Sequence, residues 1–265
     1  MHKPSNEVEW VLHQPPWQYG FRRARWHLQD VGRVIAWLDG VSEPGIYKAL
    51  KRLGFSRKQA LNFIHSPDPE FHTKWRAILR AYKEALERPD EVVILFQDEL
   101  THYRRPSWAS AYHRRGKGQP RARQEPGSNT QTRIAAVLNG VTRRVTYIQR
   151  SKVGADALVL FYEQIRAAYP EAKVIYLVQD NWSVYKLPEV AQAAAEQCLT
   201  PLFLSTYATW LNPIEKLWRW LKQEVPHLHK LAHDLPRLRQ QVCDFPDQFT
   251  GGSDALLRHV GLPPD

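Results

Sequence analysis

Three acidic residues stand where their carboxylates could act together. Asp98 comes two residues after the apolar run 92–96, and Asp180 comes two residues after the apolar run 174–178. Glu215 lies in the first turn of a segment whose start is marked by Asn212 and Pro213. Three carboxylates within a few ångströms cannot all stay ionised unless cations neutralise them. Hard oxygen ligands suit Mg²⁺ or Mn²⁺, and two such ions promote attack and departure of oxygens at phosphorus.

Two neighbours of these acids are weaker candidates. Glu99 adjoins Asp98, and successive side chains of a strand point to opposite faces of the sheet. We therefore do not expect both to hold the same ion. Asn181 follows Asp180 and could orient a phosphate or a metal-bound water.

The elements that would position the acids alternate in a recognisable order. The predicted order is a strand, a hairpin of two strands, then helix, strand, helix, strand, helix. This order implies an α/β fold with a mixed five-stranded sheet and flanking helices, as in ribonuclease H-like proteins. The first and fourth strands would then be neighbours, and the last helix would bring in the third acid. The predicted strands are 92–96, 132–138, 144–148, 173–178 and 200–204, and the predicted helices are 155–169, 186–197 and one that begins at Asn212.

Residues 1–89 have a different, helical pattern. Apolar residues recur at helical spacing over 26–38, again over 42–54 and over 72–87, while 1–20 has no clear period. Two short helices joined at Gly40 fit a helix-turn-helix or winged-helix-like DNA-binding region, with Ile46, Tyr47, Leu50 and Leu53 on the buried face of the second. Pro89 would end the third helix and the region. Basic side chains on the second helix and just after it are Lys48, Lys51, Arg52, Arg57 and Lys58.

Charge supports an anionic partner. The chain has 265 residues, 37 Lys and Arg against 27 Asp and Glu, and a net charge of +10, which favours nucleic acid over membrane. Two cysteines exclude a disulfide framework and a cysteine-built zinc site. No apolar run is long enough to cross a membrane, so we expect a soluble protein.

The excess charge is concentrated in one insertion. Residues 101–131 hold seven basic residues and one acidic residue, with aromatic residues between them. We place this insertion within a catalytic domain at 90–228, and we expect a helical or loose tail at 229–265. The basic residues that we select as DNA contacts in the insertion are Arg104, Arg105, Arg114, Arg115 and Lys117.

Several of these segments carry a family resemblance. The block Leu211-Asn212-Pro213-Ile214-Glu215-Lys216-Leu217-Trp218 resembles bacterial insertion-sequence transposases of the mariner-related DDE superfamily, the IS six-thirty type. The 34 residues that lie between Asp180 and Glu215 are a spacing typical of that group. Gln179-Asp180-Asn181, Phe96-Gln97-Asp98-Glu99 and the segment 47–56 resemble further parts of that family. The resemblance covers roughly residues 20–225.

The resemblance implies a cut-and-paste DNA transposase. Asp98, Asp180 and Glu215 would hold two Mg²⁺ ions, or Mn²⁺ ions, for phosphoryl transfer. Its substrates would be double-stranded terminal inverted repeats and a target that is commonly a TA dinucleotide. A homodimer or larger assembly would hold the two ends, in the bacterial cytoplasm at the nucleoid. Two alternatives stay open: a shortened relative that binds DNA without cutting it, and a ribonuclease H-like nuclease without strand transfer.

Overall fold

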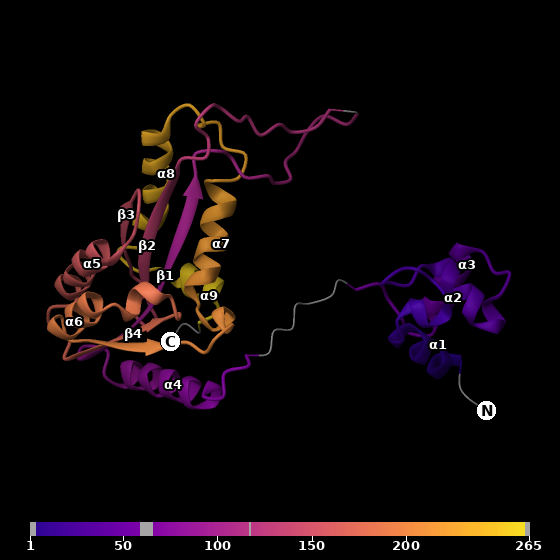
Figure 1. Cartoon of the computed structure of the whole chain (residues 1–265), viewed down its shortest axis with the longest axis horizontal. Helices are drawn as coiled ribbons and strands as arrows, with labels where there is room; N and C mark the ends of the chain where they lie inside the picture. The colour runs from indigo at the N-terminus through magenta and orange to yellow at the C-terminus, as the bar shows by residue number, and fades with distance from the viewer. Residues whose placement is uncertain (1–3, 59–65, 117, 263–265) are drawn as a thin grey trace. The chain divides into compact units, whose positions relative to one another are not determined.

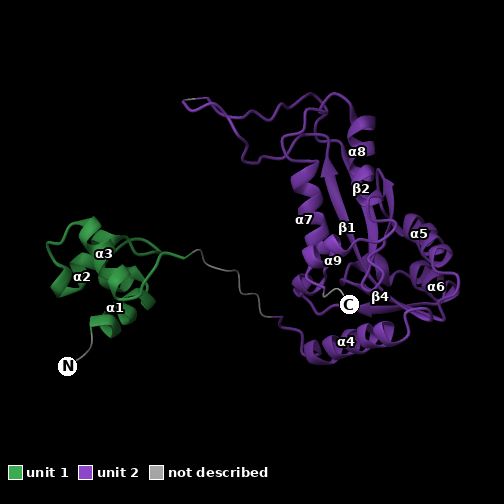
Figure 2. Cartoon of the chain, turned by 180° about the vertical axis from the view of Figure 1, so that it is seen from behind, with its two compact units in different colours: residues 1–63 green, residues 64–265 purple. Residues whose placement is uncertain are grey.

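The computed structural model describes residues 4–58, 66–116 and 118–262 (Figure 1). They form two compact units, 1–63 and 64–265 (Figure 2). In the part of the chain that the structure describes, no helix is long and apolar enough to cross a membrane.

The first unit is a small helical domain. It contains α1 Pro4–His13, α2 Leu28–Val34 and α3 Glu43–Arg52, with short 3₁₀ turns at η1 Pro16–Tyr19 and η2 Ala36–Leu38. Its core includes Val8, Val31, Leu38, Ile46 and Leu50.

The predicted helix-turn-helix corresponds to α2 and α3. A Cβ at Gly32 in α2 would lie 2.7 Å from Ile46 Cδ1 in α3, so glycine permits this close approach of the helices. The turn between them contains Gly40 at φ +72°, a conformation that favours glycine. Helix α3 keeps the predicted bounds, and Lys48, Lys51, Arg52, Arg57 and Lys58 are all exposed.

Two expectations for this unit were wrong. Residues 4–13 form a helix, which rests on burial of Val8 and Val11 on one face. Tyr47 was placed on the buried face of α3, but it is 52% exposed, because the inward face of α3 is formed by Ile46 and Leu50 and does not include it.

The second unit is built around one mixed sheet. Its strands are β1 Val92–Tyr103, β2 Gln131–Asn139, β3 Val145–Arg150, β4 Val174–Gln179 and β5 Leu199–Phe203, in the order β3-β2-β1-β4-β5. The β1–β2 and β2–β3 pairs are antiparallel, and the β1–β4 and β4–β5 pairs are parallel. This is the predicted ribonuclease H-like arrangement, with the first and fourth strands adjacent.

Helices cover both faces of this sheet, as Figure 1 shows. Helices α5 Ala155–Ala168 and α6 Pro188–Glu196 pack on one face through residues such as Phe161, Tyr162 and Ala194. The other face carries α4 Phe71–Glu87, α7 Ile214–Glu224, α8 Leu235–Asp247 and α9 Asp254–Val260. Two 3₁₀ turns, η3 Ser183–Lys186 and η4 Thr209–Leu211, connect strands to helices.

Two further boundaries differ from the expectation. Helix α4 was assigned to the DNA-binding region that would end at residue 89, but it belongs to the second unit, because Ile78, Ala81 and Ala85 are buried against the sheet. The boundary expected at residue 228 is absent as well: the tail was expected to be helical or loose, and its helices α8 and α9 bury Val242 and Leu256 in the same core as the sheet.

Candidate active site

Strand pairing brings the two aspartates to the same level of the sheet. Asp180 directly follows β4, as predicted. Asp98 was expected at the end of its strand, but β1 runs on to Tyr103, so Asp98 lies in its interior. The strand continues because it keeps pairing with β2, where Asp98 faces Ala136. The parallel register joins Phe96 to Val178, and each aspartate lies two residues beyond that pair.

A buried side chain fixes the start of α7 beside β1. The Asn212 side chain, 3% exposed, donates from Nδ2 to the backbone carbonyl oxygen of Gln97 over 2.9 Å. Asn212 was expected to cap α7, but Pro213 occupies the flanking position and the Asn212 side chain reaches across to the strand. This contact holds Glu215, in the first turn of α7, near the residue that precedes Asp98.

The three carboxylates influence one another electrostatically. The pKa of Asp98 is raised to about 8, mainly by burial. The negative charges of Glu215, Glu99 and Asp180 contribute to the same rise. Burial also raises the pKa of Glu215, and the charge of Asp180 acts in the same direction, whereas Lys222 opposes it. These shifts arise when carboxylates share a partly desolvated site.

A tryptophan reaches the central carboxylate. Trp218, one turn after Glu215 on α7, donates from Nε1 to Asp98 Oδ2 over 2.9 Å. Its ring is 2% exposed, as a core residue would be. Trp218 was given no role at the site from the sequence; its position three residues after Glu215, on the same face of the helix, was the signal that could have found it.

The acidic site offers only oxygen donors, which suits Mg²⁺ or Mn²⁺. Mutual repulsion that raises the pKa values of Asp98 and Glu215 would be relieved by a bound cation, so the residues present fit a divalent metal. As they lie in the described ranges, however, no three His, Cys, Asp or Glu side chains are grouped closely enough to hold a metal ion, so Asp98, Asp180 and Glu215 would have to draw closer together around a bound cation.

Asn181 is engaged in the loop that follows Asp180. Its Nδ2 donates to the Leu204 carbonyl oxygen over 2.6 Å, and its Oδ1 accepts from Lys186 Nζ over 3.2 Å. These contacts stabilise the loop, and a direct role of Asn181 toward phosphate or water stays a prediction.

Glu99 points away from Asp98, as strand alternation predicts. Its carboxylate accepts a hydrogen bond from the Tyr185 hydroxyl group on the α5–α6 side of the sheet. Burial raises the pKa of Glu99 to about 7.

The basic insertion leaves the sheet at the end of β1. Arg114 and Arg115 are exposed on it, and Lys117 lies outside the described residues. Arg104 instead donates from Nε to the Ala232 carbonyl oxygen, and the Arg105 guanidinium lies 5.2 Å from the centre of the Tyr103 ring.

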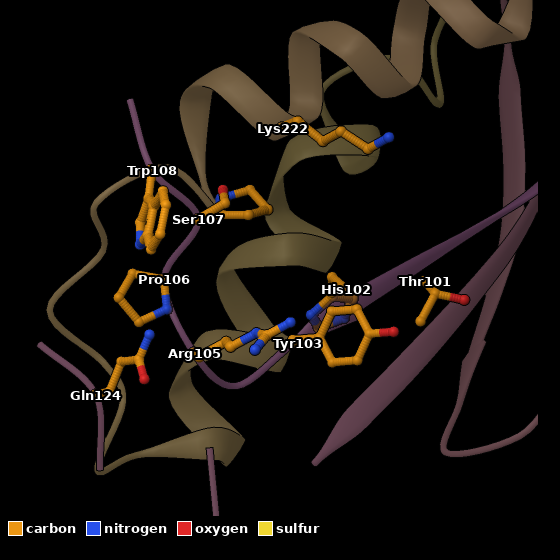
Figure 3. Close-up of a pocket in the computed structure, with 10 residues that line it drawn as sticks. Thr101, His102, Tyr103, Arg105, Pro106, Ser107, Trp108, Gln124 and Lys222 are labelled. Carbon is orange, nitrogen blue, oxygen red and sulfur yellow. The ribbon is translucent and has the colours of Figure 1, made fainter. Parts of the chain in front are cut away.

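A cavity of about 460 Å³ lies at the base of this insertion (Figure 3). Its wall combines Tyr103 and Trp108 with Arg105 from the insertion and Lys222 from α7. His102 also lines it; the ring is 4% exposed, and neither ring nitrogen has a hydrogen-bond partner among the described residues. The pKa of His102 is lowered to about 4, first by burial and then by Arg239, so the ring is neutral. Sequence reasoning did not connect Lys222 with the insertion.

Comparison with known proteins places this site in a family. Residues 93–239 match the model of the DDE superfamily endonucleases. The "Insertion element IS630 uncharacterized 39 kDa protein" of Shigella sonnei is 24% identical over 257 residues, which are 94% of this chain and 73% of that protein.

Solved structures share the fold. The Mos1 mariner paired end complex with Mn superposes with a TM-score of 0.67 at 15% identity, covering 98% of this chain and 75% of that one. The Mos1 strand transfer complex gives 0.65 at 13% identity, with 98% and 76% covered. At these identities the likeness supports the fold alone. The family model, however, spans more than half of the chain and includes Asp98, Asp180 and Glu215, so the chain belongs to the DDE superfamily of endonucleases.

Proposed function

We propose that this protein is a DNA transposase that cuts and joins the ends of its own insertion sequence. The observation that supports the proposal is that β1–β4 pairing sets Asp98 and Asp180 at the same level of the sheet and that the Asn212 contact holds the start of α7, which carries Glu215, beside β1. Family membership gives the reaction class, and both the insertion-element relative and the Mos1 complexes are proteins of mobile DNA.

The three carboxylates would hold two Mg²⁺ ions, with Mn²⁺ as a substitute. When bound, such ions lower the pKa of an attacking oxygen and neutralise charge on the leaving oxygen. Asp98 must give up its proton to serve as a ligand, and the Trp218 indole N–H orients the carboxylate that remains. Water would attack first at the element end, and the freed 3′-OH would then attack target DNA. Positioning and charge neutralisation suffice for this transfer.

The DNA would contact the basic surfaces. The exposed basic side chains on α3, just after α3 and in the insertion would neutralise DNA phosphates, a contact that does not depend on the base sequence. We propose terminal inverted repeats as the specific sites and a TA dinucleotide as the target. Two ends must be held together for joining, so at least two copies would act on DNA, at the bacterial nucleoid.

A cleavage and joining assay tests the proposal. The protein is mixed with Mg²⁺ and DNA that carries the inverted repeats flanking its gene. We expect cleavage and joining by the wild type, and neither by Asp180→Asn or Glu215→Gln, both of which should still bind DNA. Glu163→Gln is the matched control, because Glu163 is an exposed carboxylate on α5.

The alternative functions give different results. Cleavage without joining would indicate a nuclease, and binding without cleavage by the wild type would indicate a shortened DNA-binding relative. Cleavage by Asp180→Asn at the wild-type rate would refute the site.

A further inference from the structure

A second polar cluster lies behind the acidic site, on the opposite face of β1. Gln97 and Glu99 alternate with Asp98 along the strand, so their side chains enter the layer between the sheet and α5–α6. This layer is mostly apolar and includes Leu95 and Leu177, together with the buried Gln179, which accepts from the Tyr162 hydroxyl group over 3.5 Å. Polar side chains in such a layer are expected to be hydrogen-bonded to one another.

Tyr185 is the centre of this cluster. Its hydroxyl group donates to Glu99 Oε1 and accepts from Gln97 Nε2 over 3.3 Å. The Tyr185 ring is 3% exposed, so both contacts are shielded from water. A hydrogen bond to a carboxylate in such surroundings is stronger than one between neutral groups.

Tyr185 belongs to η3, the turn that directly follows the Asp180 loop. Within the loop, the backbone N–H of Trp182 donates to Asp180 Oδ1 over 2.8 Å. The Trp182 ring then meets the Tyr185 ring edge-on, with centroids 5.4 Å apart. The loop that presents Asp180 is therefore connected through Trp182 and Tyr185 to the strand that presents Asp98.

We propose that Glu99 and Tyr185 are positioning residues that fix the separation of Asp98 and Asp180 by joining their two supporting segments across β1. This inference rests on the proposed metal-dependent function. Glu99 faces away from Asp98, so it acts through Tyr185 and does not itself contact the ion. Residues that orient metal ligands typically contribute 10- to 100-fold to metal affinity.

The test is Mn²⁺ binding to the full chain, followed through the electron paramagnetic resonance signal of free Mn²⁺. Tyr185→Phe removes one hydroxyl group and Glu99→Ala removes the acceptor; each should weaken binding by about tenfold or more. Glu99→Gln should bind Mn²⁺ within about twofold of the wild type, because its amide oxygen can accept the same hydrogen bond. The double variant Glu99→Ala/Tyr185→Phe should be no weaker than the weaker single variant, since both remove one contact.

Two controls separate positioning from loss of fold. Tyr169→Phe removes a hydroxyl group from another tyrosine of the same buried layer, beside Arg144, and should leave binding unchanged. Circular dichroism at the assay temperature must show folded protein for each variant. If Glu99→Ala does not fold, Tyr185→Phe still tests the inference, because it keeps the buried ring and removes only the hydroxyl group.

The outcomes are distinct. Wild-type affinity in Tyr185→Phe would overturn the inference, and so would a Glu99→Gln variant as weak as Glu99→Ala, because then the charge of Glu99 is required. Unchanged affinity in Asp180→Asn would instead overturn the proposed metal site. Mn²⁺ binding is measured without DNA, so the inference is tested even in a preparation that does not cleave.

Discussion

Binding of a divalent cation at the acidic site should depend steeply on pH, because Asp98 must first lose a proton. Burial, with the charge of Glu215 next, raises the pKa of Asp98 from 3.8 to about 8. In the metal-free folded protein this carboxyl group is therefore mostly protonated at neutral pH. A cation competes with that proton for the same oxygens, so affinity must rise as pH approaches the pKa and level off above it.

The size of the effect follows from the shift. Each pH unit below the pKa costs about 1.4 kcal/mol, or about tenfold in apparent affinity. With a pKa of about 8, the competing proton weakens binding about a hundredfold at pH 6 and about twofold at pH 8. The apparent Kd for Mn²⁺ should therefore fall about 50-fold between these two pH values. Glu215, whose pKa burial also raises, would steepen the dependence.

Isothermal titration calorimetry of Mn²⁺ into the full chain at pH 6, 7 and 8 measures this dependence. Two buffers with different ionisation enthalpies also give the number of protons released, which should be about one or more at pH 6. Asp98→Asn is the control; it should bind weakly at every pH, because both the ligand and its proton are gone. A Kd that stays constant from pH 6 to pH 8 in the wild type would refute the reasoning.

Two further substitutions examine the supports of the site and the DNA path. Trp218→Phe should lower the free energy of unfolding by about 1–3 kcal/mol and slow cleavage with DNA binding unchanged, because Asp98 loses its indole donor. Urea unfolding and the cleavage assay measure these two effects, and cleavage at the wild-type rate would contradict the prediction. Arg114→Ala/Arg115→Ala should reduce the slope of log K against log salt by about 2, roughly one per phosphate contact. Fluorescence anisotropy over a salt series measures that slope, Arg258→Ala on α9 serves as the exposed matched control, and an equal loss in both variants would count against a DNA path along the insertion.

The strand order could be predicted from the sequence because each strand had its own signal. Residues 92–96 and 174–178 are unbroken apolar runs, and Asn139 turns the hairpin by accepting from the backbone N–H groups of Val141 and Thr142. The length of β1 could not be predicted in this way. The polar residues Gln97 and Asp98 look like the end of a strand. Their side chains can be buried because they form hydrogen bonds with Tyr185 and Trp218, which lie far along the chain.

The sequence left the tail open between helical and loose for a related reason. Residues 244–262 contain glycine and several breaks, so no helical period extends over them. Helix α9 has only seven residues, and it is stable because Leu256, Leu257 and Val260 are buried against α7 and the sheet. Tertiary packing, which a short sequence window does not report, determines such helices.

The same long strand connects the segments that carry the three proposed site acids. Side-chain alternation along β1 sends Asp98 toward α7, where Trp218 binds it, and sends Glu99 toward η3, where Tyr185 binds it. The Gln97 backbone between these faces accepts from Asn212, at the start of α7. Three consecutive residues of one strand thus contact each segment that supports an acid. A strand that ended at Phe96, as the apolar pattern suggests, would offer none of these contacts, so the polar extension of β1 is what assembles the site.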